Sequence, residues 1–259
     1  MPRKTTYRQR YTNQLVNAGA TPVKKERTQR MPVNPAVQQL YADGKLLLIN
    51  KPLHWTSFDV VRKLRSLIQI KKIGHAGTLD PLATGLLIIC TGKFTKKINE
   101  YMAQEKEYTG SFTLGAVTPT YDLESLPEQQ KDFSFVTEEL LHTACKQFTG
   151  DILQLPPVFS AIKKDGVALY QLARRGEAVE LKHRSIHISL FEINKIELPL
   201  VHFKVVCSTG TYIRSLANDF GKALGCGAYL SSLCRTRIGE FTLADAIEMD
   251  AFEKSLSIE

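Results

Sequence analysis

The 259-residue sequence lacks long apolar runs and has no apolar signal segment at its N-terminus. No stretch approaches the roughly 18 apolar residues that a membrane-spanning helix needs. The five cysteines are an odd number and form no Cys-x-x-Cys pair, which argues against a disulfide framework or a zinc ribbon. We therefore expect a cytoplasmic globular protein with reduced cysteines and no membrane partner.

Several common catalytic motifs are missing as well. Gly92-Lys93 lacks the preceding glycine of a phosphate-binding Walker loop, and no Gly-x-Ser-x-Gly elbow occurs. The six histidines show no metal-ligand spacing, since His183 and His187 fall on a predicted strand edge where their side chains would not converge. The sequence therefore gives no sign of a metal site.

Positive charge is distributed unevenly along the chain, whose formal net charge is +8. Residues 1–30 contain eight of the 34 basic residues and one of the 26 acidic residues, so this segment carries +7 and the rest carries +1. Such a segment is typical of a flexible arm that contacts phosphate by releasing counterions. The alternatives are a solvated tail and an Arg-rich transit peptide, although no clear amphipathic helix supports the second.

A single acid stands in the segment Gly74-His75-Ala76-Gly77-Thr78-Leu79-Asp80-Pro81-Leu82-Ala83-Thr84-Gly85. Three glycines and a proline in twelve residues exclude a regular helix or a central strand and predict a loop. Pro81 keeps Asp80 extended, and the apolar run 86–90 predicts a buried strand that follows the loop. An acid placed in this way has the layout of a catalytic group, although an Asp that caps a turn is the commoner use of Asp-Pro.

Apolar patterns elsewhere predict intermixed strands and helices. Strands are expected at 45–50, 106–114, 186–207 (a hairpin) and 228–241, and helices at 94–102, 137–148, 167–174, after a Thr56 or Ser57 cap, and after a Thr211 cap. The alternation in 106–114 puts Tyr108 on the core side. Arg214 falls in the first turn of the last helix, where a cation is disfavoured, so we expect it to face a carboxylate.

The predicted fold class is α+β, with a large mixed, mostly antiparallel sheet flanked by helices. We expect a basic arm and linker at 1–40, one catalytic domain at 41–250, and a short tail at 251–259.

The chemistry that remains centres on Asp80, His75, Arg214, Tyr108 and Tyr212. No second acid lies near Asp80 in the sequence, which disfavours a glycosidase pair. One ionised carboxylate fits attack on, or stabilisation of, a cationic sugar carbon whose leaving group needs no protonation. Arg214 would keep that carboxylate ionised, and the rings could stack on a base turned out of its helix.

Four motifs together resemble the TruB family of tRNA pseudouridine synthases, in order and spacing, over about residues 44–245. They are Lys45-Leu46-Leu47-Leu48-Ile49-Asn50-Lys51-Pro52, the segment from Gly74 to Gly85, Pro156-Pro157-Val158-Phe159-Ser160-Ala161-Ile162-Lys163, and Gly210-Thr211-Tyr212-Ile213-Arg214-Ser215-Leu216. The resemblance implies a pseudouridine synthase fold and the isomerisation of uridine 55 in the T-loop of tRNA, by base flipping and without cofactor or metal.

The resemblance also implies roles for individual residues. Asp80 would be the nucleophile, Tyr108 would stack on the flipped uracil and help to remove its C5 proton, and Arg214 would pair with Asp80. The substrate-contacting positions would be His75, Tyr212, Leu233, Lys51 and Lys96. As alternatives, Tyr108 and Leu233 could be plain core residues and Tyr212 a packing residue of its helix.

The chain departs from the family pattern at His54, Pro119, Thr209 and Cys234. His54 stands where the family usually has glycine, Pro119 where it has aspartate, and the other two where it has basic residues. The C-terminal RNA-binding domain called PUA, which many bacterial relatives carry, is not expected here. We hypothesise that the basic arm partly replaces it.

Two other functions remain open. The chain, which we expect to be a monomer, could be a tRNA-binding folding helper whose catalysis is secondary, or a relative that depends on a guide RNA. The presence of Asp80, Tyr108 and Arg214 together favours the enzyme, because binding alone does not require the carboxylate.

Overall fold

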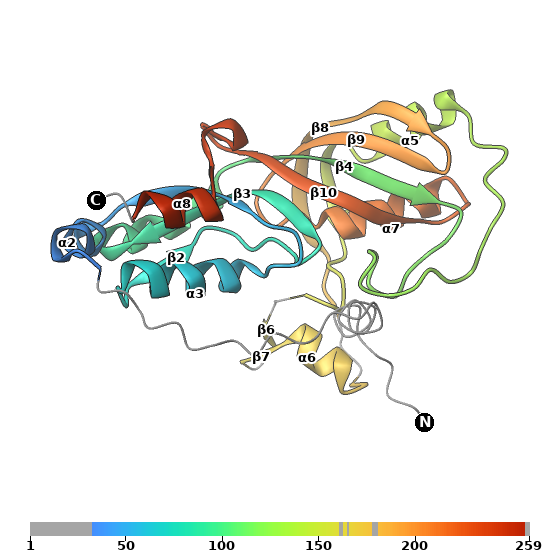
Figure 1. Ribbon diagram of the computed structural model, residues 1–259. Helices are drawn as coiled ribbons and strands as arrows, with labels where there is room; N and C mark the ends of the chain where they lie inside the picture. Colours follow the sequence, from blue (N-terminus) through green and yellow to red (C-terminus); the bar gives the residue numbers. More distant parts are fainter. Residues whose placement is uncertain (1–32, 161–162, 165, 178–180, 257–259) are drawn as a thin grey trace, which may run out of the picture.

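The computed structural model describes residues 33–160, 163–164, 166–177 and 181–256, and its centre is a ten-stranded mixed sheet (Figure 1). Its strands are β1 (Leu46–Lys51), β2 (Ile73–His75), β3 (Ala83–Thr91), β4 (Lys106–Leu114), β5 (Gly150–Gln154), β8 (Arg184–Glu197), β9 (Leu200–Cys207), β10 (Ala228–Ile238), β11 (Phe241–Thr242) and β12 (Ile247–Glu248). The main path runs β12-β1-β3-β10-β4-β9-β8-β5. The pairs β1–β12 and β3–β10 are parallel and the other described pairs of this sheet are antiparallel, which confirms the predicted α+β class.

The helices are α2 (Pro35–Asp43), α3 (Ser57–Ile68), α4 (Ile98–Ala103), α5 (Glu138–Gln147), α6 (Leu169–Arg174), α7 (Ile213–Ala223) and α8 (Met249–Ser255), with 3-10 turns η1 (Gly92–Lys97) and η2 (Leu243–Asp245) and a small hairpin of β6 (Lys163–Lys164) and β7 (Val167–Ala168). Most helices pack around the sheet, whereas α6 lies apart from it beside β6 and β7 (Figure 1). Residues of α5 and α7 share one apolar cluster with β4, β8 and β9, whereas α3 and α8 share another with β1 and β3.

Helix α3 begins where the sequence predicts, because Thr56 caps it. The Thr56 side chain accepts from the Asp59 N–H, and the Asp59 carboxylate accepts from the Thr56 N–H in return, which completes a capping box. The apolar stripe of α3 is buried, as Val60 and Leu64 illustrate at 0% exposure. Since Thr56 is the cap, the hydroxyl of Ser57 remains available for a contact with another segment.

Strand β10 determines the geometry around the acid-bearing loop, because it separates β3 from β4. Leu233 of β10 is opposite Ala83 of β3 on one side and opposite Gly110 of β4 on the other. The start of β3, which directly follows the loop, therefore lies one strand away from the part of β4 that carries Tyr108.

The segment from Gly74 to Gly85 is less irregular than its composition predicts. Gly74 and His75 belong to β2, which pairs antiparallel with β3 at Cys90 and Ile89, and the last three residues of the segment begin β3. The loop proper is 76–82. The sequence does not predict β2, because its glycines indicate a loop. A three-residue strand has little sequence pattern of its own and is stabilised by its partner strand.

The start of α7 also differs from the prediction. Tyr212, not Thr211, is the N-cap residue, and its side chain makes no capping hydrogen bond. The Thr211 hydroxyl instead donates to the Ser208 carbonyl at 3.0 Å. Threonine is a good cap by type, but here its side chain completes the preceding turn.

Both expected boundaries of the catalytic domain shift outward. Helix α2 begins at Pro35 with its Val37 buried, and α8 extends to Ser255 with Phe252 only 3% exposed. Residues 35–40 and 251–255 therefore belong to the folded unit. Residues 1–32 and 257–259 of the expected arm and tail lie outside the described residues.

All five cysteines are free, and four of them are buried. None of the helices in the described ranges combines the length and apolarity needed to cross a membrane.

Candidate active site

Asp80 is presented by a loop that is bonded to α3 and to the turn before it. The Leu79 N–H donates to the Ser57 hydroxyl at 2.8 Å, and that hydroxyl donates to the Leu79 carbonyl at 3.2 Å. On the other side of Asp80, the His54 N–H donates to the Pro81 carbonyl at 2.8 Å. The acid thus stands between two fixed peptide units, and 36% of its side chain remains exposed to solvent.

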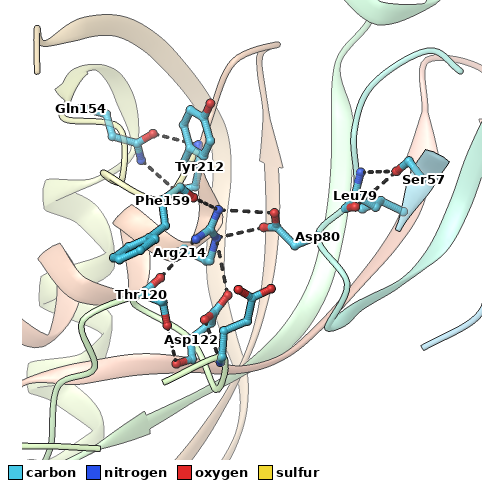
Figure 2. A network of polar contacts seen from close by, with 10 residues as sticks. Ser57, Leu79, Asp80, Thr120, Asp122, Gln154, Phe159, Tyr212 and Arg214 are labelled. Atoms are coloured by element: carbon cyan, nitrogen blue, oxygen red, sulfur yellow. Dashed lines mark hydrogen bonds and ion pairs between the residues drawn. The ribbon is translucent and has the colours of Figure 1, made fainter. Parts of the chain in front are cut away.

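Arg214 binds this carboxylate with two hydrogen bonds (Figure 2). Its Nε donates to Asp80 Oδ2 at 2.9 Å and its Nη2 donates to Asp80 Oδ1 at 3.3 Å. The same guanidinium donates to the carbonyls of Thr120 at 3.2 Å and Phe159 at 3.0 Å. Arg214 is 5% exposed, so a buried and fully oriented cation faces the acid, as the position of Arg214 in its helix predicts.

A second acid lies at the same guanidinium, which corrects the expectation that Asp80 has none nearby. Asp122 Oδ2 is 3.6 Å from Arg214 Nε, and the Asp122 side chain is 4% exposed. A backbone bridge with Leu230 of β10 brings Asp122 to the site. This bridge joins residues far apart in the chain, which is why the local sequence does not reveal the second acid.

The charges of these three residues act on one another. Burial raises the pKa of Asp122, although Arg214 opposes that shift. Burial works to lower the pKa of Arg214, but Asp80 and Asp122 outweigh it and raise that pKa. Arg214 is therefore a permanent cation between an accessible carboxylate and a buried one.

Two of the predicted aromatic residues lie within the electrostatic reach of Asp80. Tyr108 is 8% exposed, and burial raises its pKa, with the Asp80 charge as a smaller contribution. Burial also raises the pKa of Tyr212, to which Asp80 again contributes. Leu233 lines a small cleft together with both acids, Asp80 and Asp122. Leu233 therefore lies at the cleft of the acid, and the charge of Asp80 reaches both tyrosines.

Lys51 is close to the site but points away from solvent. It is 0% exposed, and its Nζ donates to the carbonyls of Pro52 at 2.9 Å and Trp55 at 2.6 Å. Burial lowers the pKa of Lys51 to about 8, while the Asp80 charge raises it. This lysine supports the turn that contacts Pro81, so its position fits a structural role better than direct contact with a bound substrate.

Lys96 lies apart from the pair of Asp80 and Arg214, and His75 belongs to β2, opposite Ile89 of β3. The Nδ1 atom of His75 is buried without a hydrogen-bond partner, and burial and the nearby Arg235 lower the pKa of His75. Lys96 is exposed in η1, beyond the far end of β3 from Asp80. The eight steps of β3 separate its ends by about 27 Å, so Lys96 cannot touch the same nucleotide as Asp80.

His54, which stands where a glycine is expected, has a φ of 66°. This left-handed conformation suits glycine and is strained for a residue with a Cβ. The departure therefore leaves the turn in the glycine-type geometry at a cost in strain.

Sequence reasoning missed three residues that shape the site: Asp122, Ser57 as a contact of Leu79, and Gln154. Asp122 lies three residues after Pro119, one of the departures from the family pattern, and this neighbourhood is the one available signal. The contact of Ser57 and the burial of Gln154 depend on packing between distant segments, which a single sequence does not display. Among the described residues, no three His, Cys, Asp or Glu side chains are placed to hold a metal ion.

Comparisons with known proteins agree on one family. The TruB family pseudouridylate synthase N-terminal domain matches residues 65–213, and the tRNA pseudouridylate synthase B C-terminal domain matches residues 214–258. The tRNA pseudouridine synthase B of Flavobacterium johnsoniae is 56% identical over 223 residues, which cover 83% of this chain and 97% of that protein. The protein of the same name from Parabacteroides distasonis is 52% identical over 206 residues, covering 77% and 88%.

Solved structures give the same fold. A chain in the crystal structure of a Cbf5-Nop10-Gar1 complex superimposes with a TM-score of 0.65 at 28% identity, covering 89% of this chain and 61% of that chain. A chain in the structure of an H/ACA RNP bound to a substrate RNA containing 2'-deoxyuridine has a TM-score of 0.63 at 26% identity, covering 88% and 59%. This chain therefore spans about three fifths of the length of these solved relatives.

Proposed function

Because the chain belongs to the TruB family of pseudouridylate synthases, we propose that it isomerises uridine 55 in the T-loop of tRNA to pseudouridine. The observation that carries this proposal is the two-bond contact between Arg214 and Asp80 at a small cleft that Leu233 also lines. The Asp80 carboxylate is held in place by Arg214 while 36% of the side chain stays exposed, so it is both oriented and accessible to a substrate.

In the proposed reaction the Asp80 carboxylate attacks the ribose carbon that carries the base. The glycosidic C–N bond breaks and its electrons leave with the uracil, which rotates in the cleft and forms a C–C bond through its C5 atom. The C5 proton is then removed and the free ring nitrogen gains a proton, so the product is an isomer of the substrate. Both carboxylate oxygens return to Arg214 when the ester to Asp80 is broken.

Arg214 has two tasks in this proposal. Its hydrogen bonds to the carbonyls of Thr120 and Phe159 fix the guanidinium, so that the carboxylate is oriented before the substrate arrives. The cation also pairs directly with the negative charge of the Asp80 carboxylate, which is the proposed nucleophile. Asp122 contributes by fixing the guanidinium from its buried side.

In this proposal Tyr108, whose pKa the Asp80 charge influences, provides the aromatic face for the flipped base. A tyrosine with a raised pKa is protonated at neutral pH, so its phenol is a hydrogen-bond donor until a proton acceptor takes its proton. Tyr108 would stack on the uracil and assist the transfer of the C5 proton, while Leu233 closes the cleft on the β10 side.

Exposed lysines of two neighbouring segments would bind the RNA backbone at a distance from the site. The Gly92 N–H donates to the Lys72 carbonyl at 2.8 Å, which places η1 beside the segment before β2. The exposed lysines of the two segments, which we call the lysine patch, are Lys71, Lys72, Lys93, Lys96 and Lys97. A helical arm of RNA can reach from the cleft to this patch, so Lys96 would contact phosphate at a distance from the reacting nucleotide.

The direct test is pseudouridine formation in an unmodified T-arm hairpin and in full tRNA. We expect product from the wild-type protein and none from Asp80→Asn, whereas Asp132→Asn, at an exposed acid outside the cleft, keeps the wild-type rate. Product from Asp80→Asn at the wild-type rate would show that Asp80 is not the nucleophile. Failure of the wild type on both RNAs would refute the proposed function.

The same assay separates the alternatives. A tRNA-binding folding helper would refold the tRNA elbow equally well with Asp80→Asn. It would also refold more tRNA molecules than it converts to pseudouridine. A protein that depends on a guide RNA would leave the bare hairpin unmodified. The proposal further includes action as a monomer in the cytoplasm, which size-exclusion chromatography and localisation of the full chain would test.

A further inference from the structure

Gln154, the last residue of β5, bonds the main chain of Tyr212 with both ends of its side-chain amide (Figure 2). The Tyr212 N–H donates to Gln154 Oε1 at 2.8 Å, and Gln154 Nε2 donates to the Tyr212 carbonyl at 3.0 Å. Gln154 is 2% exposed, so water does not compete for these bonds. We call this pair of bonds the Gln154 clasp.

The clasp lies at the entrance to the helix that carries Arg214. Tyr212 is the N-cap residue of α7, and its carbonyl also accepts the first helical hydrogen bond, from the Leu216 N–H at 3.1 Å. No capping side chain of Tyr212 itself fixes this end of the helix. Gln154, on strand β5, supplies the missing constraint. It acts on Tyr212, which is two residues before Arg214.

The residues that follow Gln154 contact the same turn of α7. The Ser215 hydroxyl donates to the Leu155 carbonyl at 2.8 Å, and Arg214 Nη2 donates to the Phe159 carbonyl at 3.0 Å. Arg184, which is opposite Gln154 in the β5–β8 pair, lies over the Tyr212 ring with 5.8 Å between the guanidinium carbon and the ring centroid. Neighbouring side chains thus fix both the main chain and the ring of Tyr212.

We propose that Gln154 is a positioning residue of the reaction, which sets the direction of the first turn of α7 and so the guanidinium of Arg214 against Asp80. The inference rests on the proposed function, because it concerns the orientation of the proposed nucleophile. An amide is required at this position, since one atom must accept from an N–H while the other donates to a carbonyl. A carboxylate cannot donate, and an apolar side chain can do neither.

The test uses Gln154→Met, which keeps the length of the side chain, and Gln154→Glu. Displacement of an oriented group by about 1 Å can reduce a rate 100-fold, so we expect the single-turnover rate on the T-arm hairpin to fall about 10- to 100-fold in Gln154→Met. The Kd for the hairpin should stay within about threefold of the wild type. Thermal melting shows whether each variant is folded, and the rates are corrected for the folded fraction.

Gln154→Glu adds a readout that a purely structural role would not change. Its protonated carboxyl has a donor and an acceptor and can restore the clasp, whereas its ionised form cannot. The ratio of its rate to the wild-type rate should therefore rise as the pH falls from 8 to 5.5. The matched control is Gln147→Glu at an exposed position of α5, for which the ratio should stay near one.

Three results would overturn the inference: a Gln154→Met rate within about threefold of the wild type, a loss that resides only in Kd, or a flat pH ratio for Gln154→Glu. These results are distinct from failure of the proposed function, in which the wild type itself makes no pseudouridine.

Discussion

Replacement of Arg214 by methionine should destabilise the protein through the buried acid and not through the reacting one. Asp80 has 36% of its side chain exposed and can be hydrated, whereas Asp122 has 4% exposed and would lose its cation. Removal of one partner of a buried ion pair costs about 3–5 kcal/mol. Because Asp122 still accepts from the Glu124 N–H at 3.0 Å, we expect about 3 kcal/mol at pH 8, or roughly 6–12 °C in Tm.

The pH dependence of this loss has a definite sign. Burial already raises the pKa of Asp122, and removal of Arg214, which lowers it, must raise it further. A carboxyl whose pKa in the folded state lies above its unfolded value destabilises the folded state as the pH rises through the folded-state pKa. The Tm deficit of Arg214→Met should therefore be large at pH 8 and shrink toward pH 5.

The assay is thermal denaturation of the wild type, Arg214→Met and the double variant Arg214→Met/Asp122→Asn at both pH values. The double variant removes the buried charge, so it should regain most of the lost Tm at pH 8 without regaining pseudouridine formation. A deficit of Arg214→Met below about 1 kcal/mol at pH 8, or a double variant that melts no higher than the single one, would refute this electrostatic reasoning.

Three further outcomes are expected. The wild type should become more stable from pH 8 to 10, because burial lowers the pKa of Lys51 to about 8 and the unfolded chain then binds more protons than the folded one. Lys51→Met should lack this gain in stability. Urea denaturation at both pH values measures it, and an equal change in the free energy of unfolding for the two proteins would contradict the prediction. His54→Gly should raise Tm by a few degrees, since relief of a left-handed φ is worth about 1 kcal/mol, and a lower Tm would contradict the assignment of strain. Deletion of residues 1–32, which stops before α2, should reduce tRNA affinity and lower the salt slope by at least about two; an unchanged slope would show that the arm does not contact phosphate.

The sequence predicts the regular parts of the fold well, because they depend on local patterns. The alternation from Lys106 to Leu114 gives β4 with its observed ends, and the capped apolar stripe after Thr56 gives α3. β2 and the start of α7 were not predicted correctly, since their order comes from a partner strand and from the Gln154 clasp. Neither contact has a signature in the neighbouring residues.

In the candidate site, too, the sequence predicts the features that depend on local patterns and not those that depend on distant contacts. The glycines and Pro81 mark the loop of Asp80, and the position of Arg214 in a first helical turn indicates its need for a carboxylate, which the structure confirms. The sequence does not predict that Asp122 belongs to the site, because a backbone bridge to β10 brings it close to Arg214. Lys51 was predicted to contact the substrate on residue type and motif, whereas its direction follows from packing under the turn at Pro52.

The place of β10 between β3 and β4 affects when the site can assemble during synthesis of the chain on the ribosome. Asp80, Tyr108 and Arg214 all leave the ribosome before residues 228–238, yet β3 and β4 meet only through that strand. A nascent chain that ends near residue 225 therefore contains every reacting group and still lacks the element that aligns them. The β3-β10-β4 part of the sheet can form only when almost the whole chain is present, so folding depends on late contacts between distant residues.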